Sequence, residues 1–291
     1  MSLSKTTLGP FELYTIETGD FRLDGGAMFG VVPKTLWSRN LPADHKNRIP
    51  MTMRCLLIKS NNTGKIYLVD NGAGTKFDDK MKGIYQLDQE KKNLEKSFKE
   101  HGFTFEDVTD LIFTHLHFDH CGGTTYYNDE GELDLLFPNA EYYVVESHWK
   151  NATNPNAREK ASFLPENIDP LSNTDRLHLV EEGHEYEPGL STIIANGHTI
   201  GQQLPKIEAD GKTLVFVADL LPTHVHTPLP WVMGYDMYPV QTLNEKETFL
   251  QQAAQENWYL YLEHDSEKEI IRIDSNGRKY SVSETLHLSN I

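Results

Sequence analysis

Short apolar runs rich in β-branched and aromatic residues recur along the chain, and glycine, asparagine or charged residues separate them. Runs of this length and composition are typical of buried strands. Residues 53–60 and 65–72 flank the tetrapeptide "NNTG", and this arrangement predicts a β-hairpin. Further strands are expected over 110–115, 141–147, 190–197, 212–219 and 258–265.

Two longer segments have the apolar spacing of helices and recognisable ends. Residues 87–101 stop before Gly102, and glycine favours the C-terminal end of a helix. Residues 245–256 follow Asn244, which is a good N-cap residue. A short helix is expected over 106–110, just before a strand. Because strands and helices alternate, the pattern predicts an α/β sandwich.

The chain has no internal repeat and no clear linker, so we expect a single domain over residues 1–291. Residues 24–50 fit no regular element and mix glycine, proline and apolar residues. A loop of this length in a compact domain is usually functional. We interpret it as a lid or wall of a substrate pocket, with a partner interface, such as a homodimer contact, as the alternative.

The charge of the chain narrows the function classes. The 43 acidic and 27 basic residues give a formal net charge of −16, which opposes binding to the phosphates of DNA or RNA. No apolar run approaches the roughly 18–20 residues of a membrane span. The first residues lack the apolar core of a signal peptide. We therefore expect a soluble, cytoplasmic protein that binds neither nucleic acid nor membranes.

One stretch, "THLHFDHCGG" at 114–123, concentrates polar side chains that are costly to bury together. His115 and His117 point the same way if the strand register persists. Asp119 and His120 then lie in the next turn, aimed at the same region. Imidazole nitrogens and carboxylate oxygens suit zinc and similar metals. The stretch predicts a site for two neighbouring metals, and we interpret the adjacent Cys121 as a packing residue.

One motif cannot complete two coordination shells, so other segments must contribute. Three candidates, His198, Asp219 and His264, each come at or just after the end of an apolar strand. Ends of this kind gather at one edge of a sheet, where α/β proteins build their sites. The pair His224 and His226 is a weaker alternative that could line a pocket or bind metal. Ordinary structural roles are expected for His45, His101, His148, His178, His184 and His287.

The run "HLHFDH" resembles the H-x-H-x-D-H signature of the metallo-β-lactamase fold superfamily. "GHTIG" (197–201), "AD" (218–219) and "EHD" (263–265) are similar to later motifs of that superfamily, in the same order. The resemblance implies an αββα sandwich with a dinuclear metal site at its edge. The implied ligands of one metal are His115, His117 and His198. The implied ligands of the other are Asp119, His120 and His264, and Asp219 bridges both.

Two divalent metals about 3.5–4 Å apart can share a hydroxide and polarise a substrate oxygen. The expected reaction is therefore hydrolysis of an ester, lactone, thioester, amide or phosphoester. Asp119 has a second expected role, because a carboxylate beside the metals can orient the hydroxide or pass a proton to the leaving group. Zinc is the expected metal, with manganese, iron(II) or cobalt as alternatives.

Further stretches, 23–37, 218–239 and 245–253, are similar to quorum-quenching N-acyl-homoserine lactonases of the YtnP type and to methyl parathion hydrolase. The resemblance also implies that true zinc β-lactamases lack a carboxylate at the position of Asp219, so β-lactamase activity is not expected. The expected function is hydrolysis of N-acyl-homoserine lactones or related small esters. The alternatives are an organophosphate triesterase or thioesterase with the same site, and a metal-binding protein without turnover.

The sequence also departs from those lactonases. They carry a tyrosine three residues after the bridging aspartate, where this chain has Pro222; Tyr235 or Tyr238 could take its role. Gln202 belongs either to the pocket or to a surface loop, and Phe118 is expected beneath the site. An acyl chain needs an apolar groove. The candidates for it are Met28, Phe29, Trp37, Trp149 and Trp231.

Overall fold

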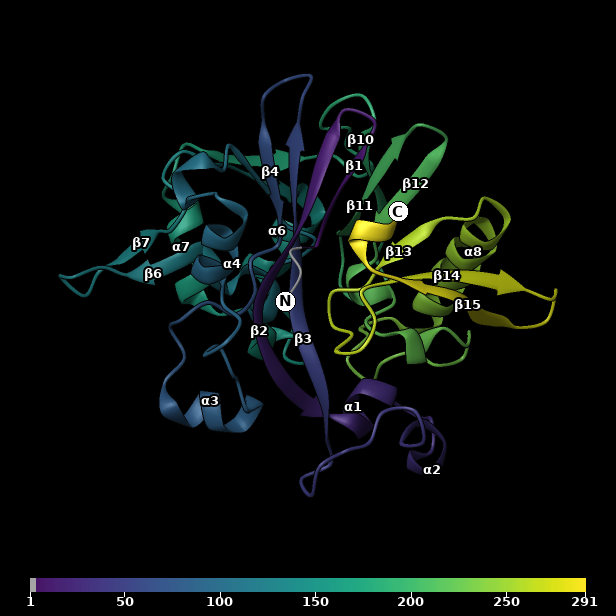
Figure 1. Cartoon of the computed structure of the whole chain (residues 1–291). Helices are drawn as coiled ribbons and strands as arrows, with labels where there is room; N and C mark the ends of the chain where they lie inside the picture. The colour runs from purple at the N-terminus through teal and green to yellow at the C-terminus, as the bar shows by residue number, and fades with distance from the viewer. Residues whose placement is uncertain (1–3) are drawn as a thin grey trace.

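The computed structural model describes residues 4–291, and its main body is two β-sheets packed face to face (Figure 1). The first sheet has seven strands in the order β1-β2-β3-β4-β5-β8-β9. They are β1 Lys5–Leu8, β2 Phe11–Asp24, β3 Arg48–Ser60, β4 Ile66–Val69, β5 Asp110–Ile112, β8 Glu141–Val145 and β9 Leu177–Val180. Strands β4, β5, β8 and β9 run parallel to one another.

The second sheet has six strands in sequence order, and only β12 and β13 pair in parallel. The strands are β10 Leu190–Ala195, β11 Gln202–Ala209, β12 Lys212–Phe216, β13 Tyr259–Tyr261, β14 Ile270–Ser275 and β15 Tyr280–Leu286. A small separate ribbon is formed by β6 Thr125–Tyr127 and β7 Leu133–Leu135.

Helices cover the outer face of each sheet. The α-helices are α1 Gly25–Phe29, α2 Lys34–Trp37, α3 Asp79–Tyr85, α4 Leu94–His101, α5 Phe118–Cys121, α6 Glu146–Thr153, α7 Pro165–Ser172 and α8 Pro239–Gln255. Side chains of α4, α6 and α7 share one apolar core with the first sheet, and α8 packs on the second. Figure 1 shows α4 and α7 on the left and α8 on the right. This αββα layering confirms the expected fold class.

Strand β3 shows why the two sheets stack. Its side chains alternate between two cores because successive residues of a strand point to opposite faces. Leu56 and Ile58 join the core between the sheets, whereas Cys55 and Leu57 join the core under the helices. A strand apolar on both faces is stable only when both are covered, which explains the near-continuous apolar run.

The expected hairpin is present, since β3 and β4 pair antiparallel with Leu56 opposite Val69. Two helix starts were placed wrongly. Helix α4 begins at Leu94 rather than at residue 87, because the side chain of Asn93 caps it. Helix α8 begins at Pro239, well before Asn244, since proline fits the first turn of a helix. The expected stop at Gly102 is confirmed by its left-handed φ of 79°.

Other expectations also need correction. Residues 24–50 are not wholly irregular, since they contain α1, α2 and the start of β3. The helix expected over 106–110 is a 3-10 turn at Phe105–Asp107, after which β5 begins. Gln202 opens β11 and is fully buried, so the surface-loop alternative is wrong. Strand β2, the longest in the described chain, was not foreseen.

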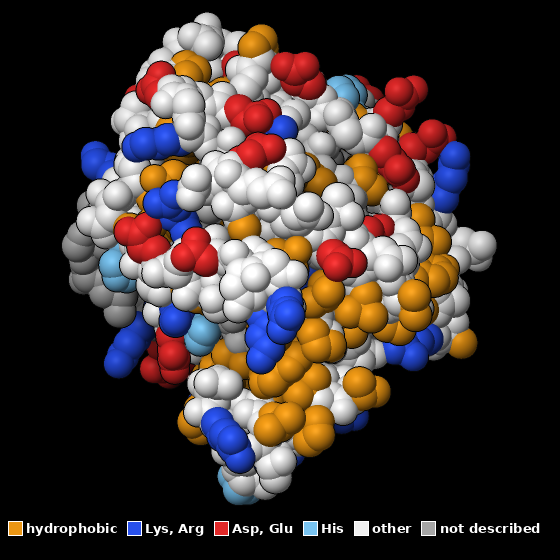
Figure 2. Space-filling model, turned by 90° about the vertical axis from the view of Figure 1, so that its right-hand side faces the viewer, with side chains coloured by type: hydrophobic (Ala, Val, Ile, Leu, Met, Phe, Trp, Pro, Cys, Tyr) orange, Lys and Arg blue, Asp and Glu red, His pale blue; other side chains and the backbone are white. Residues whose placement is uncertain are grey.

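Exposed apolar residues mark the segment that carries α1 and α2. Val31 is 94% exposed and Leu36 is 43% exposed. In Figure 2, hydrophobic side chains gather in the lower half of the molecule, at the height where Figure 1 places these two helices. A homodimer through this surface stays a prediction. None of the helices in residues 4–291 combines the length and the apolar character that crossing a membrane requires.

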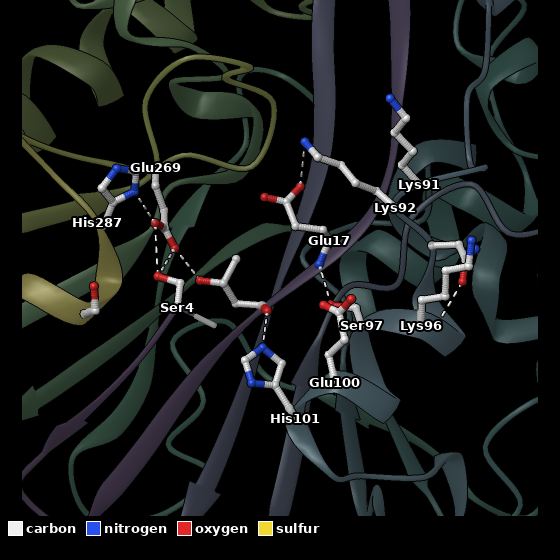
Figure 3. Close-up of a pocket in the computed structure, with 13 residues that line it drawn as sticks. Ser4, Glu17, Lys91, Lys92, Lys96, Ser97, Glu100, His101, Glu269 and His287 are labelled. Carbon is white, nitrogen blue, oxygen red and sulfur yellow. Dashed lines mark hydrogen bonds and ion pairs between the residues drawn. The ribbon is translucent and has the colours of Figure 1, made fainter. Parts of the chain in front are cut away.

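A cavity of about 570 Å³ lies between β2, α4 and the C-terminal residues (Figure 3). Its lining is highly charged, and several of the charged side chains have partners within the lining or next to it. Lys92 pairs with Glu17 and Asp20, and the hydroxyls of Ser4 and Thr15 donate to Glu269. None of the candidate metal ligands named from the sequence lines this cavity.

Lys246 of α8 fixes a loop between β12 and α8. Its side chain is buried, with 1% of the residue exposed. The ammonium donates hydrogen bonds to the carbonyl oxygens of His226, Pro228 and Trp231, the last at 2.8 Å. These hydrogen bonds hold residues 226–231 against the helix, and the acceptors of the Lys246 ammonium are backbone carbonyl groups rather than a carboxylate.

Replacing Lys246 with methionine should lower the free energy of unfolding by about 2–4 kcal/mol, because buried carbonyl groups lose their donors. Chemical denaturation followed by circular dichroism measures the change. Lys212→Met is the matched control, since Lys212 is exposed and its replacement should cost less than about 0.5 kcal/mol. Equal effects of the two substitutions would contradict the anchoring role of Lys246.

Candidate metal centre

Four of the candidate ligands form a first group, in which the ligand atoms all lie within 4.8 Å of one another: His115, His117, His198 and Asp219. Nδ1 of His117 is 3.0 Å from Nε2 of His115 and 3.2 Å from Nε2 of His198. All four residues are buried. The first and third implied motifs, some 80 residues apart in sequence, therefore meet in space.

The second group consists of Asp119, His120 and His264, again with ligand atoms within 4.8 Å of one another. Nε2 of His264 is 3.1 Å from Nε2 of His120, and 3.8 Å from Oδ2 of Asp119. Asp119 and His120 come from the short helix α5, whereas His264 follows β13. All seven residues named from the sequence therefore meet at one centre.

Asp219 lies between the two groups. Its Oδ2 is 3.0 Å from Nε2 of His198, and its Oδ1 is 3.2 Å from Nε2 of His264. It belongs to the 3-10 turn that follows β12, and the preceding Ala218 has a left-handed φ of 40°. A non-glycine residue in this region is strained, and such strain collects at functional sites. The carboxylate thus faces both groups, as a bridging ligand would.

The centre fits a pair of metal ions. Ring nitrogens of several buried imidazoles face one another at about 3 Å, and their lone pairs repel unless a cation or proton lies between them. Oδ1 of Asp219 is buried and accepts no hydrogen bond from the described residues. Five imidazoles with two carboxylates make a donor set that zinc prefers.

Charge and burial act together here. Burial alone would lower the pKa of His198, but the carboxylates of Asp219 and Asp236 outweigh it and raise that pKa to about 10. Burial would raise the pKa of Asp219, but His198 and His264 hold it well below its usual value. For His115, burial and the neighbouring histidines lower the pKa well below its usual value. Asp219 is therefore ionised at neutral pH.

Outer partners orient the rings of the first group, as is usual for metal-binding histidines. The second nitrogen of His117, Nε2, is 3.3 Å from Oε1 of Glu159. Nδ1 of His198 is 3.0 Å from Oδ1 of Asp236. Sequence reasoning missed both carboxylates, because each lies about 40 residues from its histidine and belongs to no recognisable motif.

Outer partners of the second group come from other elements. Nδ1 of His264 donates to the carbonyl oxygen of Thr52 in β3. Nδ1 of His120 faces Oδ2 of Asp70 at 3.1 Å and Oε2 of Glu263 at 3.0 Å. The sequence contained a signal for both carboxylates. Asp70 follows an apolar strand, as the candidate ligands do, and Glu263 directly precedes His264.

The weaker histidine candidates have other partners. His226 bonds to the carbonyl oxygen of Met28 and stacks on Phe29 with ring centroids 4.5 Å apart. His224 contacts Oδ2 of Asp265 at 2.5 Å. His148, for which an ordinary structural role is expected, receives a hydrogen bond from the backbone of Leu116, between two candidate ligands. These three histidines shape the surroundings of the centre.

Packing explains the two small residues that follow His120, namely Cys121 and Gly122. Cys121 is buried, and its thiol donates to the carbonyl oxygen of Leu116, which agrees with a packing role. A Cβ atom on Gly122 would lie 2.2 Å from the carbonyl oxygen of Ala73. This glycine therefore allows close packing against the 70–74 loop, rather than an approach to the metals.

A pocket of about 470 Å³ opens onto the centre and exposes one side of it. Its polar wall includes Arg158, Glu159 and Tyr235. Its apolar lining includes Leu23, Met28, Met51, Phe118 and Met233. The residues that line the pocket therefore offer an apolar surface beside the metal centre, of a size usual for small-molecule sites.

Only Met28, of the five groove candidates, lines this pocket among the described residues. Phe29 and Trp37 instead stack on each other in the core, and Trp149 packs under the first sheet. Phe118 forms pocket wall and contacts Tyr85. Tyr235 and Tyr238 are the two candidates to replace the tyrosine that this chain lacks at Pro222. Of these two, Tyr235 lines the pocket.

Known proteins resemble the chain in sequence and fold. A curated N-acyl homoserine lactonase from Bacillus cereus is 28% identical over 116 residues, which are 40% of this chain and 39% of that protein. The alignment thus spans about two fifths of the relative. A probable metal-dependent hydrolase from Staphylococcus aureus has 29% identity and a TM-score of 0.85, covering 97% of this chain and 100% of that one.

A third relative shares the fold at lower identity. AidC, a dizinc quorum-quenching lactonase solved with the product N-hexanoyl-L-homoserine, has 23% identity and a TM-score of 0.79, with 96% of each chain covered. The sequence profile of the metallo-beta-lactamase superfamily matches residues 54–264, which include all seven candidate ligands. With this match over most of its length and a matching fold, the chain belongs to the metallo-beta-lactamase superfamily.

Proposed function

We propose that the chain is a dinuclear, zinc-dependent hydrolase of N-acyl-homoserine lactones or related small esters. The observation that carries the proposal is Asp219, whose two oxygens face His198 and His264 at 3.0 and 3.2 Å. A carboxylate in this position can join two metal sites into one reactive centre. The similarity to a lactonase sequence and to a dizinc lactonase structure supports the choice of metal and substrate.

When bound, a pair of divalent metals supplies a Lewis acid for the substrate carbonyl and lowers the pKa of a water nucleophile. The chain supplies positioning and proton transfer. Asp119 lines the pocket and is 7% exposed, so it can orient the water or hand a proton to the leaving oxygen. No nucleophilic side chain is needed.

The pocket suits a substrate with a polar head and an apolar tail. Met28, Met51 and Met233 line one wall, and methionine adapts to flexible chains. Tyr235 lines the same pocket and is proposed to replace the tyrosine that the lactonases carry at the position of Pro222. Its hydroxyl is proposed to bind the substrate carbonyl.

Pro222 also supports a second candidate function. It is buried where the lactonases carry a tyrosine, so recognition of a lactone carbonyl cannot use that position. An organophosphate triester or a thioester could use the same centre without it. These substrates form the alternative within the same reaction class.

The substrate class is tested by kinetics on zinc-loaded protein with three families: N-acyl-homoserine lactones, aryl phosphotriesters and glutathione thioesters. Lactones should show kcat/KM at least about 10⁴ M⁻¹s⁻¹, the lower end for natural substrates. Longer acyl chains should lower KM, because each buried methylene contributes about 0.8 kcal/mol. Turnover of triesters or thioesters with none of lactones would refute the lactonase assignment.

Asp219→Ala tests the bridging role. The wild-type protein should bind about two metals per chain, and the variant should lose metal and about 1,000-fold or more in kcat/KM. Inductively coupled plasma mass spectrometry gives the metal content, and circular dichroism checks the fold. Asp129→Ala, at an exposed position, is the control. Full activity in the Asp219 variant would exclude a bridging carboxylate.

Metal binding should also stabilise the fold, because the ligands come from four separate segments. Zinc at about 1,000 times its dissociation constant contributes about 4 kcal/mol, or roughly 8–16 °C in Tm. Differential scanning fluorimetry with and without chelator measures the shift. The same Tm in both conditions would mean that the centre does not bind metal in the folded protein.

A further inference from the structure

Residues 156–159 connect α6 to the next turn and lie against the metal centre. Glu159 is 4% exposed and lines the pocket beside the candidate ligands. Its neighbour Arg158 is exposed and lines the same pocket. Consecutive side chains thus line the pocket at the centre, from a segment that contributes no candidate ligand of its own.

Glu159 contacts both histidine segments of the first group. Its Oε1 is 3.3 Å from Nε2 of His117 and accepts a hydrogen bond from the hydroxyl of Thr199. Thr199 directly follows the candidate ligand His198. The other oxygen, Oε2, accepts from Nδ2 of Asn151 at 3.0 Å. The carboxylate is therefore fixed on both sides, and the protein has placed it with a defined orientation.

The contact determines which nitrogen of His117 is free for metal. Nδ1 faces the other ring nitrogens of the first group, at 3.0 Å from His115 and 3.2 Å from His198. A carboxylate at Nε2 keeps the proton there, so Nδ1 presents its lone pair to the centre. Glu159 thus selects the tautomer of His117 and the direction of its ring.

Arg158 acts on the other histidine of the group. Its guanidinium donates to the carbonyl oxygens of Gly234 and Asp236, the latter at 3.3 Å. The side chain of Asp236 contacts Nδ1 of His198 at 3.0 Å and accepts from the backbone of Met233. Arg158 therefore fastens the loop whose carboxylate orients His198.

The second group takes its outer contacts from a different part of the fold. His264 bonds to Thr52 of β3, and His120 faces Asp70 and Glu263. In residues 4–291, no hydrogen bond or ion pair joins Arg158 or Glu159 to the second group. Apart from Asp219, which faces both groups, the two groups therefore have separate outer contacts.

We propose that Arg158 and Glu159 form a clamp that positions the ligands of one metal only, the metal of His115, His117 and His198. Glu159 is the main positioning residue, because it contacts a ligand directly, and Arg158 acts through Asp236. This inference rests on the metal centre of the proposed function but not on its substrate. It predicts that the two metal positions can be weakened separately.

The test is a chelator titration of zinc-loaded wild type, Glu159→Gln, Glu159→Ala and Arg158→Met, with released zinc measured by a colorimetric indicator. Glu146→Gln is the matched control, at an exposed position of α6. Glu159→Ala should release one metal about 10- to 100-fold more readily and leave the other unchanged. Glu159→Gln should fall between, since its amide oxygen still accepts from Nε2, and Arg158→Met should have a smaller effect.

Cobalt loading gives a second readout that does not depend on turnover. The absorption bands of the weakened position should change in Glu159→Ala, while those of the other position persist. Equal weakening of both metals would indicate general loss of structure and overturn the clamp, and so would two unchanged affinities. If lactones are not turned over but one metal is selectively lost, the clamp stands and the proposed substrate class fails. If lactones are turned over and both metal affinities are unchanged in Glu159→Ala, the proposed substrate class stands and the clamp fails.

Discussion

The arrangement of this fold depends on the cost of burying five imidazoles and two carboxylates together. His115, His120 and His264 are at most 1% exposed, and ring nitrogens of the cluster approach to about 3 Å. Facing lone pairs of neutral imidazoles repel unless a proton or a cation lies between them, and unpaired charges in a protein interior are expensive. A pair of cations, as the proposed function requires, would offset both costs. The remaining features of the centre can be understood as means of keeping these groups in place until metal binds.

The two sheets place the candidate ligands near one another, and hydrogen bonds from other residues orient the histidine rings. Strands β10, β12 and β13 each end three residues before a candidate ligand, so the topology brings these candidates together. The rings are then fixed by Glu159, Asp236 and Asp70, which come from loops. Because the segments around Glu159 and Asp236 also line the pocket, the orientation of the histidine rings and the access of a substrate depend on the same segments. A change in a pocket loop can therefore alter metal binding.

The sequence predicted the centre better than its surroundings. His115 to His120 could be recognised because four ligands occupy six consecutive residues, and His198, Asp219 and His264 because each comes at or just after the end of an apolar strand. Glu159 and Asp236 could not be found, since their contacts arise only when distant loops pack together. The predicted starts of α4 and α8 were wrong for a local reason. Asn93 and Pro239 determine where these helices begin, and the apolar spacing does not. Aromatic residues assigned to a groove proved to be core, because composition does not reveal which side of a loop faces solvent.

Anomalous diffraction from crystals of zinc-loaded protein tests the central claim most directly. The account predicts two zinc peaks about 3.5–4 Å apart. One peak should be coordinated by His115, His117 and His198, the other by Asp119, His120 and His264, with one oxygen of Asp219 on each. A single peak, or two peaks without Asp219 between them, would contradict the account.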